Sequence, residues 1–76
     1  MSAVTLGKGI RVAKNTVVAI VDYEEEQFTE AGKQTRYTAY IYVLNCPVPI
    51  AFSTLDIEEL NTLIYNAEEN LYEPIT

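Results

Sequence analysis

The alternation of apolar and polar residues predicts two long strands in the first two thirds of the chain. Residues 37–44, Tyr-Thr-Ala-Tyr-Ile-Tyr-Val-Leu, are all uncharged and mostly aromatic, β-branched or aliphatic. Residues 17–23, Val-Val-Ala-Ile-Val-Asp-Tyr, repeat this character. Such residues favour strands. The connection between them is too short for a helical crossover, so we expect the two strands to pair antiparallel.

The segment between these strands is predicted to leave the sheet. Glu24, Glu25 and Glu26 are three adjacent like charges that repel one another and prefer water. The first strand is therefore expected to end there or to run out into solvent. Residues 29–34, with Gly32 at a turn, are expected to form a loop.

The strand at residues 37–44 has two faces of different character. Tyr37, Ala39, Ile41 and Val43 fall on one face and suit packing under a helix, whereas Tyr40 and Tyr42 fall on the other face with Thr38 and Leu44. Two interpretations of the tyrosines remain open. They pack against aromatic neighbours within the sheet, or they form an interface stripe, where tyrosine is enriched.

One helix is predicted near the C-terminus. Asp56 is a good N-cap, and Glu59 three residues later completes an Asp-x-x-Glu capping arrangement. Pro74 prevents continuation of the helix. A buried stripe at helical spacing is expected from Ile57, Leu60, Ile64, Ala67 and Leu71, widened by Leu63.

Shorter apolar runs complete the predicted sheet. Residues 4–6 and 10–12 flank a Gly-Lys-Gly turn. Because Pro49 lacks an amide donor, residues 48–52 are expected to form an edge strand or a strand interrupted by a bulge. The predicted fold is a single α+β domain spanning residues 1–76. Its core is an antiparallel sheet of three to five strands, with one C-terminal helix packed on one face.

The size of the chain predicts a homodimer. A domain of 76 residues buries only about 60% of its unfolded surface, and such domains often need disulfides, metals or partners. Cys46 is the sole cysteine and the chain has no histidine, so neither an internal disulfide nor a zinc site is expected. Oligomerisation therefore remains as the expected source of additional stability. The expected interface uses Tyr40 and Tyr42, or an edge strand at residues 48–52 that includes Phe52.

Charge is distributed unevenly along the chain. The net charge is −6, and residues 37–76 contain six acids and no base. This excess argues against direct nucleic-acid binding and favours a basic protein as the partner, with DNA-binding proteins as the expected class. The alternative interpretation is that the acids form only a solvated, solubilising surface. The expected partner-binding residues are Asp56, Glu58, Glu59, Glu68, Glu69 and Glu73, extended by Glu24, Glu25 and Glu26 if the hairpin tip lies nearby.

Nothing in the sequence indicates catalysis. The chain has no histidine, and no base is placed to activate Cys46, so we expect a non-enzymatic protein without cofactor or metal. The longest apolar run is far shorter than the roughly 20 residues of a membrane span. A lone thiol is compatible with a reducing compartment. We therefore expect a cytoplasmic protein, in the host cytoplasm if it is phage-encoded.

Two stretches resemble known bacterial families. Val4-Thr-Leu-Gly-Lys-Gly-Ile-Arg-Val12 followed by Val17-Val-Ala-Ile-Val-Asp22 resembles the opening of small RemA/RemB-like regulators. The order of predicted elements after residue 35, which ends in Phe52-Ser-Thr-Leu-Asp-Ile-Glu-Glu-Leu60, is similar to that of small FlbD-like flagellar proteins. These resemblances imply a structural or regulatory protein. RemA-like proteins bind DNA through an excess of basic residues, and this chain has no such excess. In composition the chain is also similar to small acidic phage inhibitors that mimic DNA.

Overall fold

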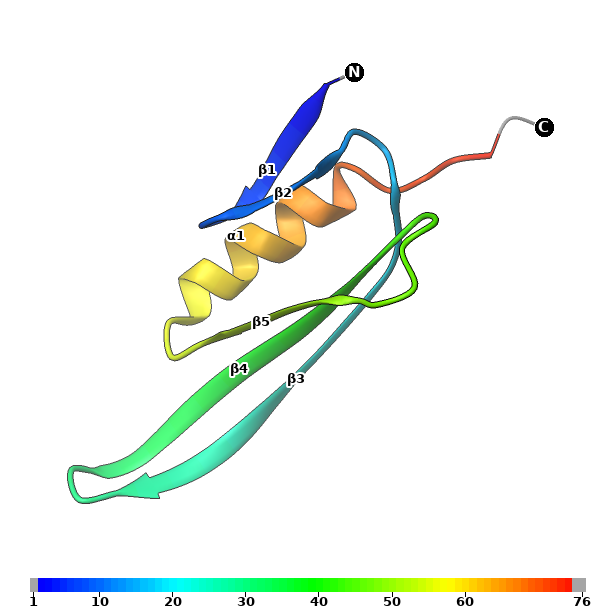
Figure 1. The fold of residues 1–76 in the computed structure, drawn as a ribbon. Coiled ribbons are helices and arrows are strands. Elements are labelled where there is room, and N and C mark those ends of the chain that lie inside the picture. The colour runs from blue at the N-terminus through cyan, green and yellow to red at the C-terminus, as the bar shows by residue number, and fades with distance from the viewer. Residues whose placement is uncertain (1, 75–76) are drawn as a thin grey trace.

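Five strands and one helix make up the fold of the computed structural model, which describes residues 2–74 (Figure 1). In chain order the elements are β1 (Ala3–Gly7), β2 (Ile10–Ala13), β3 (Val17–Thr29), β4 (Gly32–Val43), β5 (Ile50–Thr54) and α1 (Ile57–Glu68). They form an antiparallel three-stranded sheet, an antiparallel two-stranded hairpin and a helix near the C-terminus. The predicted α+β fold is confirmed.

The three-stranded sheet has the strand order β3-β4-β5, so β4 is central and β5 lies at an edge, as predicted. The sheet turns one side of β4 toward α1. Ala39 and Ile41 on this side are completely buried, and Tyr37 and Val43 pack partly buried against the same core. The side of β4 with Tyr37, Ala39, Ile41 and Val43 therefore lies under the helix, as the alternation predicts.

The β1–β2 hairpin covers a second side of the helix, which therefore lies between the hairpin and the larger sheet (Figure 1). Leu6 of β1 is fully buried, and the Asn66 side-chain amide donates a 2.7 Å hydrogen bond to the Leu6 carbonyl. Gly7 permits the close approach, since a Cβ there would stand 3.1 Å from Leu63 Cδ1. The core formed in this way contains Leu6, Val12, Val17, Ala39, Ile41, Leu60, Leu63 and Ala67.

Two outcomes were predicted for the first long strand at the three glutamates: that it ends there is wrong, and that it runs out into solvent is confirmed. The predicted loop at residues 29–34 is wrong, because strand pairing leaves only Glu30 and Ala31 outside the ladder. β3 continues to Thr29 and pairs with β4 as far as a turn at Glu30 and Ala31, where Gly32 adopts a φ of 117°. Residues 24–36 therefore form a two-stranded ribbon, here called the arm, that projects beyond the rest of the fold (Figure 1).

Two features offset the repulsion among the glutamates of the arm. Successive strand residues point to opposite faces, so Glu25 is separated from Glu24 and Glu26. β4 also places bases opposite β3. Glu25 pairs in register with Arg36, and Glu26 forms a 2.8 Å salt bridge with Lys33. Lys33 and Arg36 lie on β4, so a prediction made from the residues of β3 alone does not take their charges into account.

The predicted helical stripe is confirmed in its centre and wrong at its ends. Leu60, Leu63 and Ala67 are buried, but Ile57 is 47% exposed. Leu71 is 42% exposed and lies outside the helix, where it forms a parallel bridge with Val17. The helix ends at Glu68 because the chain then turns to pair with the edge of β3.

Candidate binding surfaces

The first turn of α1 is capped mainly by side chains that precede it. The Asp56 carboxylate accepts a 3.0 Å hydrogen bond from the amide of Glu58, as expected of an N-cap. The Asp56 amide donates to the hydroxyl of Thr54 at 3.0 Å. The reciprocal Glu59 contact expected of a capping box is absent from the described residues, because the Glu59 carboxylate instead lies 3.5 Å from the Thr54 hydroxyl.

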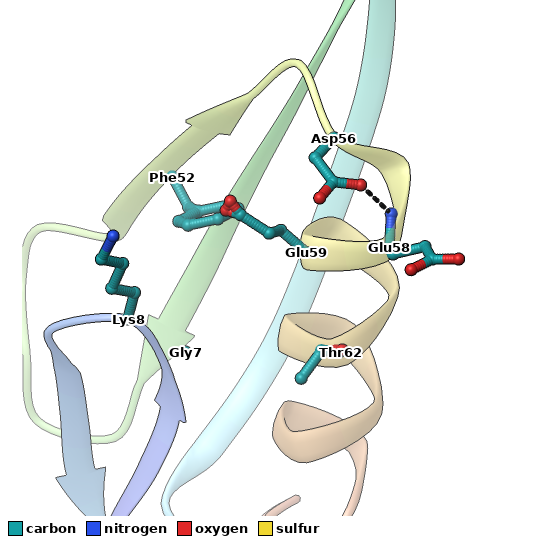
Figure 2. Close-up of a pocket in the computed structure, with 7 residues that line it drawn as sticks. All are labelled: Gly7, Lys8, Phe52, Asp56, Glu58, Glu59 and Thr62. Atoms are coloured by element: carbon teal, nitrogen blue, oxygen red, sulfur yellow. Dashed lines mark hydrogen bonds between the residues drawn. The ribbon is translucent and has the colours of Figure 1, made fainter.

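A shallow hollow of about 410 Å³ lies between this turn, β5 and the β1–β2 turn (Figure 2). The Phe52 ring lies in it with the Glu59 side chain beside the ring, and Lys8 extends toward it from the opposite rim. Asp56 and Glu58 lie on the helix side. The hollow therefore combines an aromatic ring with three carboxylates and one base.

The solvent side of α1 brings acids from both ends of the helix onto one face. At 3.6 residues per turn, Glu58 and Glu69 are about three turns and about 16 Å apart on one side. Tyr65, 62% exposed, lies between them. We call this surface the acidic helix face, and its residues, all exposed, are Glu58, Asn61, Thr62, Tyr65, Glu68 and Glu69.

Glu73 joins the C-terminal end of this surface. It lines an open hollow of about 480 Å³ together with Glu68, Glu69, Asn15 and Tyr72. The last helical turn contains no base. Acids at a helix C-terminus oppose the helix dipole by about 0.3–1 kcal/mol each. Their placement therefore does not serve the stability of the helix.

The structure brings only one of the three arm glutamates to the helix. Glu24 lines a hollow with Ile57 and Asn61, next to the helix N-terminus. Glu25 points to the opposite side of the arm, and Glu26 is held by Lys33. Glu24 therefore extends the acidic surface, whereas Glu25 and Glu26 do not.

Tyr40 and Tyr42 lie together on the side of the sheet that faces away from the helix. Register pairs Tyr40 with Val21 and Tyr42 with Ala19. The Tyr23 ring stacks on that of Tyr40, with centroids 6.3 Å apart and planes 24° from parallel. We call this surface the open face, and its residues are Ala19, Val21, Tyr23, Thr38, Tyr40, Tyr42, Ala51 and Ser53.

The stacked pair changes the acidity of one phenol. Hydrogen bonding to Tyr23 and the charge of its ionised form raise the pKa of Tyr40 above its ordinary value of 10.0, with smaller contributions from desolvation and from Tyr42 and Glu25. Tyr40 thus packs on an aromatic neighbour within the sheet, which is the first of the two interpretations, whereas the interface role of the tyrosines stays a prediction.

Phe52 lies apart from these tyrosines. It belongs to β5, where it pairs with Ala39, and it packs partly buried against the core on the helix side. Sequence reasoning thus grouped Phe52 with Tyr40 and Tyr42, but the structure separates them by the thickness of the sheet. Sequence reasoning also overlooked Val21 and Tyr23, which the strand alternation and the hairpin register bring beside Tyr40.

Residues 2–74 contain no group of three or more His, Cys, Asp or Glu side chains placed to hold a metal ion. No helix within this range is long and apolar enough to cross a membrane. Cys46 is exposed, and its thiol lies 3.3 Å from the Val48 carbonyl.

The chain matches no model of a known protein family, and comparisons with curated proteins and with solved structures give no match either. The resemblance to RemA/RemB-like and FlbD-like proteins therefore stays a prediction.

Proposed function

We propose that this protein is a non-enzymatic binding module that captures a basic, DNA-binding protein through the acidic helix face, in the manner of a DNA mimic. The observation that carries the proposal is that the acids of this face form no salt bridge within the described part of the chain. Among residues 2–74 the single salt bridge joins Lys33 to Glu26 on the arm, far along β3 from the helix. The carboxylates of Glu58, Glu68 and Glu69 are exposed and form no salt bridge within this range.

The geometry of the face supports the same proposal. A DNA-binding site recognises phosphate largely by charge, so carboxylates spaced along a rigid helix can replace phosphates. The helix is fixed on both sides by the core, so the carboxylates are carried on a rigid element. Tyr65 at the centre of the face supplies an aromatic ring, a residue type common at binding hot spots.

The test compares two variants that each remove three negative charges. The first, E58Q/E68Q/E69Q, changes the acidic helix face. The second, E25Q/E26Q/E30Q, changes acids of the arm. A histone-like architectural DNA-binding protein on a fluorescent duplex serves as the probe, and release of the duplex is followed by anisotropy.

The parent and the arm variant should release the duplex equally well, and the helix-face variant should not. Release by the parent should weaken steeply with salt, because exposed charges are screened within about 8 Å at physiological ionic strength. Equal release by both variants would mean that the acids serve solubility alone. No release by the parent at low salt, from this probe or from a basic protein captured from lysate, would reject the mimic.

A further inference from the structure

The chain is too extended for a monomer of its mass. It exposes 5555 Å² of surface, whereas a compact monomer of 8.5 kDa exposes about 4,650 Å². Its radius of gyration is 14.0 Å, against about 11 Å expected for 76 residues. The arm accounts for much of this extension (Figure 1). An unsupported two-stranded ribbon is only marginally stable in water, so the fold is expected to gain from a partner surface.

The open face is formed by uncharged residues, and the Arg36 guanidinium at its border donates a 3.1 Å hydrogen bond to the Ser53 hydroxyl. Its eight residues include no acid and no base. Val21 is 48% exposed, Tyr23 42% and Tyr42 39%, so large apolar area remains in contact with water. The Tyr23–Tyr40 stack already fixes two of the rings, which lowers the entropy lost when a partner packs on them.

We propose that two copies of this chain pack their open faces together about a twofold axis, forming a two-layer, six-stranded sandwich. The excess area of about 900 Å² per chain is close to the roughly 800 Å² that each partner buries in a standard interface. Tyrosine and valine would form the core of the contact, and the adjoining side of the arm, with Glu25, Gln27, Gln34 and Arg36, would form its polar rim.

The distribution of charge on the chain favours a second copy of the chain as the partner of the open face. A twofold contact places the same patch on both sides, so the patch must be compatible with itself. A chain with a net charge of −6 meets this requirement only where acids are absent. The open face meets this requirement. A contact through this face also leaves the two acidic helices on opposite outer sides of the sandwich, where they are furthest apart.

Pairing of sheet edges is a less favourable route to a dimer. The free edge of β3 carries Asp22 and Glu24–Glu26 but no base, so two β3 strands would bring like charges together. The other edge, β5, has only five residues and follows Pro49. Both edges therefore resist the contact that the open face permits. This dimer does not depend on the proposed capture of a basic protein.

Sedimentation velocity of the full chain at 1–100 μM tests the proposal. The parent should sediment as a species of twice 8.5 kDa. Val21→Glu places two carboxylates across the axis and should raise the dimer dissociation constant roughly 100-fold or more. Tyr65→Glu adds the same charge on the acidic helix face and should leave the dimer intact. Circular dichroism checks that each variant keeps the parent's fold, and Tyr42→Glu replaces Val21→Glu if the latter unfolds.

A cross-linking experiment gives a second readout. In a Cys46→Ser background, cysteines are introduced one at a time at Val21, Tyr40 and Ala51, with Tyr65→Cys as the control. Mild oxidation should link two chains at one or more open-face positions and not at the control position. A parent that is monomeric at 100 μM, or Val21→Glu and Tyr65→Glu variants that dissociate equally, would overturn the proposal. In the first case the open face would serve another partner or none.

Discussion

Leu63 joins the β1–β2 hairpin to the rest of the fold, and its truncation should be severe. The side chain is completely buried, and its Cδ1 lies against Gly7. Leu63→Ala removes three carbon atoms, worth about 2.4 kcal/mol at about 0.8 kcal/mol each. The cavity left behind raises the loss to about 3–4 kcal/mol. A chain of this length has a total stability of roughly 4–11 kcal/mol, so the variant should lose a third or more of it.

Thermal and urea denaturation followed by far-UV circular dichroism measure this loss. At about 4–8 °C per kcal/mol, a loss of 3 kcal/mol lowers the Tm by roughly 12–24 °C. Tyr65→Ala on the solvent side of the same helix should shift stability by only about 0.5 kcal/mol. All samples need one protein concentration, because association makes Tm depend on concentration. Equal losses for the two variants would refute the assignment of Leu63 to the core.

A double-mutant cycle with Gly7 makes the test specific to this contact. Gly7→Ala alone places a methyl 3.1 Å from Leu63 Cδ1 and should cost about 1 kcal/mol or more by overpacking. In the Leu63→Ala background the same methyl enters vacated space and should cost close to nothing. The coupling of about 1 kcal/mol lies within the range measured for residues in contact. If Gly7→Ala costs the same in both backgrounds, Leu63 does not pack on Gly7.

Two further predictions concern polar groups. Asn66→Ala removes the amide that donates to the Leu6 carbonyl and should lower stability by about 1–2 kcal/mol in urea denaturation, an effect that Asn61→Ala on the solvent side should not reproduce. Because the pKa of Tyr40 is raised in the folded state, the unfolded chain loses this proton first, so stability should be full below pH 10.0 and fall as pH rises past it. Tyr40→Phe should reduce that fall, and parallel losses in parent and variant would contradict the effect.

Alternation along residues 37–43 of β4 was sufficient to predict which side of this strand lies under the helix. The side with Ala39 and Ile41 is buried under α1, and the side with Tyr40 and Tyr42 is open. On β3, simple alternation would place Val17 on the same face as Ala19 and Val21, but a bulge lies between Val17 and Ala19. The bulge places Val17 in the core, whereas Ala19 and Val21 lie on the open face. No pattern within a single strand indicates such a shift.

The continued strand pairing along the arm was not predicted, because its stability is not local. Three consecutive glutamates argue against a strand when considered alone, but Lys33 and Arg36 on the neighbouring strand provide opposite charge. Exposure of the acids in the C-terminal half was predictable, since carboxylates are seldom buried. The grouping of these acids on one face was not predictable, because it depends on where α1 ends and on how the arm projects. Only the structure separates Glu24, beside the helix, from Glu25 and Glu26.

The open face and the acidic helix face should respond to salt in opposite directions, and this difference makes the two proposals separable in one titration. Each chain carries a net charge of −6, so bringing two chains together is opposed by repulsion that salt screens. Self-association through an uncharged face should therefore tighten as salt rises. Capture of a basic protein gains from the same charges and should weaken over the same range. A dimer that loosens with salt would point to an interface containing ion pairs, and hence to the rim residues Glu25 and Arg36 rather than to the tyrosines.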